Sequence, residues 1–76
     1  MTLQTSPPPS KVADKIRGIA VEKRIRQADM AEVLKVSRMA IVRRLNGTVP
    51  FTDRELKALS DYMNVPVGAF FGEVAS

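Results

Sequence analysis

The sequence contains neither cysteine nor histidine among its 76 residues. The lack of cysteine excludes disulfide bonds and thiolate metal sites. The lack of histidine removes the most common general base and the most common metal ligand of proteins. Aromatic residues are also few, and the chain has only Phe51, Tyr62, Phe70 and Phe71. Because no constellation of residues suited to catalysis is present, we expect no enzyme and no bound metal or cofactor.

Long apolar runs are missing as well. None approaches the ~20 residues that a membrane-spanning helix requires, and the N-terminus lacks the apolar segment of a secretory signal. We therefore expect a soluble intracellular protein. The length and the hydrophobic content of 45% suit one small domain around one core.

Three consecutive prolines end the first part of the chain and argue against a helix there, because proline lacks the amide hydrogen. The predicted organisation is a flexible arm over residues 1–9, one domain over residues 10–72 and a tail over residues 73–76. The arm has no Lys or Arg, so we interpret it as a leader rather than a DNA-binding element.

Positive charge is concentrated in one part of the chain. Residues 11–46 contain ten Lys or Arg and four acidic residues, a net charge of +6, whereas residues 47–76 contain two and four, a net charge of −2. Together they account for the overall charge of +4. This asymmetry indicates either a surface that binds a polyanion or a solvated surface with a chance imbalance.

Apolar residues recur at helical spacing, and no segment shows the alternation of a strand. The first predicted helix covers residues 11–24, with Ser10 as its N-cap. Its expected buried stripe consists of Val12, Ile16, Ile19 and Ala20. Close packing is the reason we expect for Gly18, which otherwise weakens the helix.

Residues 27–45 predict two short helices joined by a tight corner. The first, over residues 27–34, turns three side chains toward the core: Met30, Ala31 and Leu34. After the corner, Ser37 is a good N-cap, because its hydroxyl can accept a bond from a free amide of the next turn. The second helix covers residues 38–45 and ends at Asn46-Gly47, where Gly47 supplies the left-handed residue.

The helix over residues 38–45 has two distinct faces. Ile41 and Leu45 lie one turn apart and are expected to face inward. The side chains expected on the outer face are Arg38, Met39, Val42 and Arg43. A short helix with arginines on its free face suits the major groove of DNA.

The clearest helix start is the capping box Thr52-Asp53-Arg54-Glu55. It predicts a helix over residues 53–63, capped by Asn64 at its end. Three side chains line its inner face: Leu56, Leu59 and Met63; Tyr62 is a further candidate. A last short helix reaches residue 71, with Phe70 in the core, Phe71 exposed and Gly72 as the stop.

These segments resemble a known family. The stretch QADMAEVLKVSRMAIVRRLNG, followed by a capped helix and YMNVPVGAFF, is similar to the DNA-binding domain of the lambda repressor/Cro family. The resemblance extends over about residues 11–71. Its specific points are Gln27, Ala31, Val36-Ser37, Ile41 and Asn46-Gly47. It implies an all-α fold of five short helices around one core, with the helix-turn-helix at residues 27–45.

Two residues depart from the family pattern. Lys35 stands where the family usually has glycine in the corner, and a positive φ there costs roughly 1 kcal/mol. Arg44 stands where many members bury an aliphatic residue. Either the stem of Arg44 packs while its head reaches solvent, or Leu45 takes the buried position.

Carried over to this sequence, the family's contacts assign base edges to Arg38, Met39 and Arg43. Arginine pairs with guanine, and methionine offers apolar contact, for example to a thymine methyl group. The residues expected to contact phosphate are Gln27, Ser37, Arg44, Asn46 and Thr48. The other basic side chains are expected to be solvated or to attract phosphate diffusely: Lys11, Lys15, Arg17, Lys23, Arg24 and Arg26.

The resemblance implies a regulator of transcription that binds double-stranded DNA, namely a small phage-type repressor or Cro-like protein that occupies an operator. Such a protein would lie in the cytoplasm of a bacterial host cell and would associate with the nucleoid when bound. Two alternatives stay open: a DNA-binding protein of low sequence specificity with a structural role, and an antitoxin-like module whose main partner is a protein. A homodimer could form through the C-terminal region or on DNA only, and a monomer is the other possibility.

Overall fold

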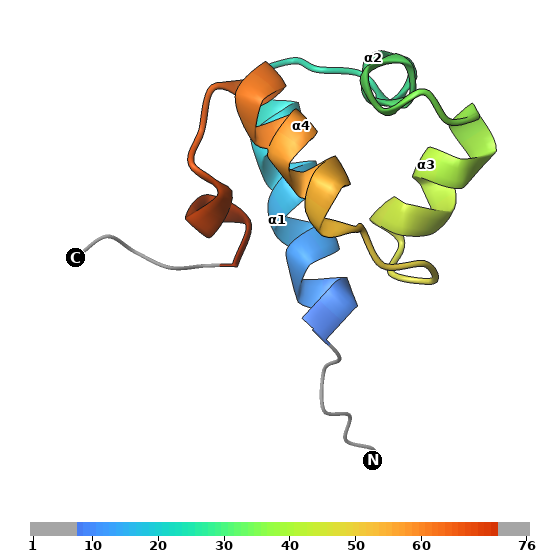
Figure 1. The fold of residues 1–76 in the computed structure, drawn as a ribbon, viewed down its shortest axis with the longest axis horizontal. Coiled ribbons are helices and arrows are strands. Elements are labelled where there is room, and N and C mark those ends of the chain that lie inside the picture. Colours follow the sequence, from blue (N-terminus) through green and yellow to red (C-terminus); the bar gives the residue numbers. More distant parts are fainter. Residues whose placement is uncertain (1–7, 72–76) are drawn as a thin grey trace.

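The computed structural model describes residues 8–71 as four α-helices followed by a short 3-10 helix (Figure 1). The elements are α1 (Pro8–Glu22), α2 (Gln27–Leu34), α3 (Arg38–Leu45), α4 (Asp53–Met63) and the 3-10 helix η1 (Val67–Phe71). The prediction of an all-α domain is confirmed, with a 3-10 helix as the fifth element. None of the helices between residues 8 and 71 is long and apolar enough to cross a lipid bilayer.

All five elements contribute to a single core. Helix α2 packs against α3 and α4, α1 packs against α3 and η1, and η1 in turn packs against α4. The largest fully buried side chains are Ile16, Met30, Ile41, Leu59, Met63 and Phe70. The inward residues predicted for α3 and α4 are thus confirmed, and Phe70 from η1 closes the core.

Helix α1 differs from the prediction at its start and on its buried face. It begins at Pro8, so Ser10 lies inside the helix and is not its N-cap. Proline is tolerated there, because amides of the first helical turn have no partner within the helix. The prediction that no helix includes residues 8 and 9 is therefore wrong. Residues 1–7 of the predicted arm, Gly72 and the tail lie outside the described residues.

The buried stripe of α1 is rotated slightly from the predicted one. Ala13 is buried, whereas Val12 and Ile19 are only partly buried. Gly18 is exposed, and a Cβ atom built on it would meet nothing within 4 Å, so the prediction of close packing at this glycine is wrong. Tyr62 of α4 is exposed as well and does not join the core.

The same capping motif ends all four α-helices. After α1, Ile25 N–H donates to Ala20 O (2.8 Å) and Arg24 N–H donates to Val21 O (3.2 Å), which is the bond pattern of a Schellman motif. Corresponding bonds end the three later helices. The residue with positive φ in each motif is Arg24, Lys35, Gly47 or Asn64. The fold therefore places two long basic side chains in a backbone conformation that glycine adopts at lower cost.

Candidate nucleic-acid interface

The corner between α2 and α3 is built from backbone bonds and one side-chain cap. Lys35 has φ 59° and ψ 43°, the left-handed conformation predicted for this position. Val36 N–H donates to Ala31 O (3.0 Å), and the Val36 side chain packs against the core. Ser37 Oγ then accepts a bond from Ala40 N–H (3.0 Å), so α3 starts at Arg38 as predicted. These local bonds set the direction in which α3 leaves the corner.

The rotation of α3 about its own axis follows from two buried side chains. Ile41 and Leu45 are both buried in the core. Arg38, at the first turn of α3, and Arg43, on the side away from the core, are both exposed, and Met39 is 56% exposed, so Met39 is not a core residue. Val42 is half-buried rather than fully outward. Neither Arg38 nor Arg43 forms an ion pair with another residue between positions 8 and 71, so both guanidinium groups are available to a ligand.

Arg44 lies on the same helix but points toward α4. Its Nε donates to Glu55 Oε1 (3.0 Å), its Nη2 donates to Glu55 Oε2 (3.1 Å), and its Nη1 donates to Ala40 O (3.1 Å). The side chains of Arg44 and Glu55 are 16% and 15% exposed. Leu45 therefore takes the buried position, and the head of Arg44 binds Glu55 rather than reaching solvent. This pair joins α3 to α4 and leaves Arg44 poorly placed for a phosphate contact.

Glu55 serves two partners at once. The Glu55 carboxylate also accepts a bond from Thr52 N–H (3.0 Å), and the backbone N–H of Glu55 donates to Thr52 Oγ1 (3.1 Å). These two bonds confirm the predicted capping box. Burial by itself would raise the pKa of Glu55, but the hydrogen bonds and charge of Arg44, with the bonds from Thr52, outweigh it and lower the pKa below its ordinary value of 4.5. The carboxylate is therefore ionised at neutral pH.

A second arginine, on α1, also holds the C-terminal end of α3. Arg17 Nη1 donates to the backbone carbonyl of Leu45 (2.8 Å), and Arg17 Nη2 donates to Asp14 Oδ1 (2.6 Å). Arg17 is predicted from the sequence to be solvated or to attract phosphate diffusely, and no local pattern links it to a residue 28 positions away. The structure thus shows two arginine contacts that hold α3, one toward α1 and one toward α4.

The residues predicted to contact phosphate lie at the ends of α2 and α3. Gln27 is the first residue of α2 and is exposed. The Ser37 hydroxyl accepts the α3 cap bond and keeps its own hydrogen for a ligand. Beyond α3, Thr48 N–H and Thr48 Oγ1 donate to Asn46 Oδ1 (3.2 and 2.8 Å), which leaves the Asn46 NH₂ group for an acceptor. Ser37, Asn46 and Thr48 thus lie next to the ends of α3 in the chain, whereas Gln27 begins α2.

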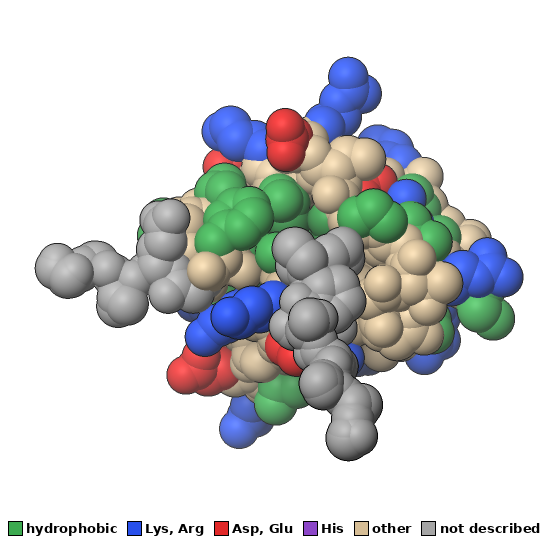
Figure 2. All heavy atoms as spheres, turned by 90° about the horizontal axis from the view of Figure 1, so that it is seen from below, with side chains coloured by type: hydrophobic (Ala, Val, Ile, Leu, Met, Phe, Trp, Pro, Cys, Tyr) green, Lys and Arg blue, Asp and Glu red, His purple; other side chains and the backbone are tan. Residues whose placement is uncertain are grey.

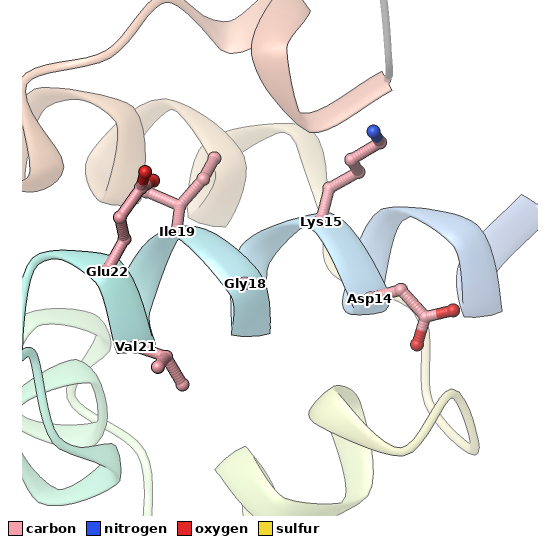
Figure 3. A pocket seen from close by; sticks show the side chains of 6 residues that line it. All are labelled: Asp14, Lys15, Gly18, Ile19, Val21 and Glu22. Carbon is pink, nitrogen blue, oxygen red and sulfur yellow. The ribbon is translucent and has the colours of Figure 1, made fainter.

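The described residues also form two depressions, one on α1 and one between the end of α2 and the start of α4. Lys and Arg side chains are spread around the outline of one face rather than gathered in one patch (Figure 2). A shallow depression on α1 is lined by residues of that helix alone, around the position where Gly18 lacks a side chain (Figure 3). Among residues 8–71, no three potential metal ligands of the Asp, Glu, Cys or His type come together.

One of the comparisons with known proteins found a family match. A protein-family model described as Helix-turn-helix matches residues 16–70, which is most of the chain. Comparison with curated proteins and with solved structures found no match. The matched range begins in α1 and ends in η1, so it covers α2, α3, the corner between them and most of the core that supports them.

Proposed function

Because the chain belongs to the lambda repressor/Cro-type helix-turn-helix family of DNA-binding regulators, we propose that it is a small phage-type repressor or Cro-like protein. In this proposal it occupies an operator in double-stranded DNA by placing α3 in the major groove. The observation that carries the proposal is the outer face of α3. It presents Arg38, Met39 and Arg43 from a helix that is anchored by two buried side chains.

Base recognition is assigned to these three side chains. Each arginine can donate two bonds to O6 and N7 of a guanine, and a good bidentate pair is worth ~1–3 kcal/mol of discrimination against a wrong base. Met39 cannot donate or accept strong hydrogen bonds, so it selects an apolar group such as a thymine methyl. The proposed operator therefore has guanines at two positions and a thymine near the one read by Arg38.

Phosphate contacts are assigned to the groups that flank α3. Gln27, Ser37, Asn46 and Thr48 each have polar atoms on an exposed side chain. Arg44 is left out, because its guanidinium is engaged by Glu55 and Ala40. The contacts by uncharged groups hold the protein in register, whereas the free Lys and Arg side chains make binding weaken as salt rises.

In this proposal, the protein regulates transcription by occupying its site on DNA. A bound protein would exclude polymerase or a competing regulator from the same DNA. Two copies on a palindromic operator would match the symmetry usual for such proteins. Their contact is assigned to the C-terminal region, where Phe71 is exposed beside the half-buried Val67.

Selection from a pool of random duplexes, followed by competition binding, tests the proposal. We expect a selected duplex to compete at least a hundredfold better than a scrambled duplex of the same length, in line with the specificity ratios of such proteins. A ratio of only a few would favour a structural DNA-binding protein. Absence of binding to every duplex would favour a module whose main partner is a protein.

A further inference from the structure

The C-terminal end of α3 has one carbonyl that the helix cap does not satisfy. The last carbonyls of an α-helix lack partners within the helix. Here Asn46 N–H donates to Val42 O (3.0 Å), Gly47 N–H donates to Arg44 O (3.2 Å) and Thr48 N–H donates to Arg43 O (3.0 Å). The next carbonyl, that of Leu45, accepts its bond from Arg17 of α1.

Asp14 holds Arg17 in the conformation that makes this contact possible. The two residues lie one helical turn apart on α1, and the Asp14 carboxylate accepts a bond from Arg17 Nη2 while Nη1 reaches Leu45 O. Figure 3 shows Asp14 on the opposite side of α1 from Lys15 and Glu22. The guanidinium thus bridges a carboxylate on α1 and the backbone of α3 through two of its nitrogen atoms.

We propose that Arg17 is a positioning residue for DNA recognition, which fixes the C-terminal end of α3 and thereby the approach of Arg43 to a base. The inference rests on the proposed function. Helix α3 has only eight residues, so a shift of its last turn changes the position of Arg43 directly. Specific binding requires that position, whereas non-specific binding to the phosphate backbone tolerates a shift.

The competing role for Arg17 is a direct phosphate contact, because its side chain is 49% exposed. The two roles predict opposite effects of removing Asp14. If Arg17 positions α3, Asp14→Ala loosens the guanidinium and weakens specific binding. If Arg17 binds phosphate, Asp14→Ala removes a negative charge and releases the arginine, so binding becomes tighter.

The experiment measures dissociation constants of full-length variants for the selected duplex and for a random duplex, over a series of salt concentrations. Arg17→Ala is compared with Lys15→Ala, which removes one positive charge from an exposed position of the same helix. Asp14→Ala is compared with Glu22→Ala, which removes one negative charge from an exposed position of α1. Thermal unfolding of each variant is recorded alongside.

We expect Arg17→Ala to bind the selected duplex about fivefold more weakly than Lys15→Ala, the order expected for one partly exposed charge-assisted hydrogen bond. The affinity of Arg17→Ala for the random duplex, and the salt dependence of its binding, should match those of Lys15→Ala. Asp14→Ala should bind the selected duplex about twofold more weakly than Glu22→Ala. If Arg17→Ala does not fold, the comparison of Asp14→Ala with Glu22→Ala decides the question, because the two roles predict weaker and tighter binding, respectively, for Asp14→Ala.

Tighter binding by Asp14→Ala, or a loss of about 0.9 from the salt slope in Arg17→Ala relative to Lys15→Ala, would overturn the inference in favour of a phosphate contact. Equal affinities of Arg17→Ala and Lys15→Ala for the selected duplex would also overturn it. A wild-type protein that binds both duplexes equally would instead refute the proposed function. The two failures are therefore distinguishable.

Discussion

The ion pair between Arg44 and Glu55 predicts a measurable coupling between α3 and α4. The pair has two short bonds, and both side chains are about one-sixth exposed. Exposed ion pairs contribute ~0–1 kcal/mol, whereas breaking a fully buried pair costs about 3–5 kcal/mol. Because this pair lies between those limits, we expect Arg44→Met to lower the free energy of unfolding by about 2 kcal/mol at neutral pH.

A double-mutant cycle isolates the interaction from other effects of each change. Glu55→Gln is a suitable second substitution, because glutamine also serves at this position of a capping box. We expect a coupling energy of about 1–2 kcal/mol between Arg44→Met and Glu55→Gln. The measurement is urea unfolding of the wild type, both single variants and the double variant, followed by circular dichroism.

The pair Lys57–Asp61 on α4 provides the matched control. Its charges are 3.7 Å apart and both side chains are 71% exposed, so its coupling should be about 0.5 kcal/mol or less. If the cycle for Arg44 and Glu55 gave a coupling no larger than this control, the reasoning about partial burial and bidentate geometry would be refuted.

Further predictions concern backbone conformation and pH. Lys35→Gly should raise the free energy of unfolding by about 1 kcal/mol, and Gly47→Ala should lower it by at least about 1 kcal/mol, because only glycine adopts a positive φ freely. Urea unfolding measures both changes. A lower stability of Lys35→Gly or a higher stability of Gly47→Ala would contradict the left-handed conformations. Gly18→Ala should raise the melting temperature, with a gain of about 0.5–1 kcal/mol, since a Cβ meets nothing there; a loss of stability would indicate a hidden contact. Because folding lowers the pKa of Glu55, the stability contributed by its ionised carboxylate is present above pH 4.5 and is lost as the pH falls through the lowered folded-state pKa. Urea unfolding across that range should therefore show that acid lowers the free energy of unfolding less in Glu55→Gln than in the wild type.

Features that depend on neighbours within one helical turn could be predicted from the sequence. The Ser37 cap and the capping box of Thr52 and Glu55 follow from short-range hydrogen bonding. The left-handed conformation of Lys35 was implied by the family resemblance, because the family usually has glycine at that position. The boundaries of α2, α3 and α4 follow from these signals, and the spacing of apolar residues then identifies their buried faces.

Features that depend on the packing of distant segments could not be predicted. The long-range partners of Arg17 and Arg44, which are Leu45 and Glu55, lie 28 and 11 residues away. The spacing of residues along one helix does not identify a partner on another helix. The sequence did not reveal that α1 begins at Pro8, because proline occurs both in the first turn of a helix and outside helices. The prediction of close packing at Gly18 is wrong because this residue lies on the opposite side of α1 from the buried Ile16 and Ala20, where no other element packs against it.

The most direct test of the central claim replaces both exposed arginines of α3, Arg38 and Arg43, with alanine and measures the affinity for the selected duplex. The control is Lys15→Ala with Lys23→Ala, which removes the same charge from exposed positions in α1 and just beyond it. We predict a loss of at least about a hundredfold for the α3 variant, from two base contacts of ~1–3 kcal/mol each, and a loss of only a few-fold for the control. Equal losses in the two variants would contradict the assignment of the outer face of α3 to DNA recognition.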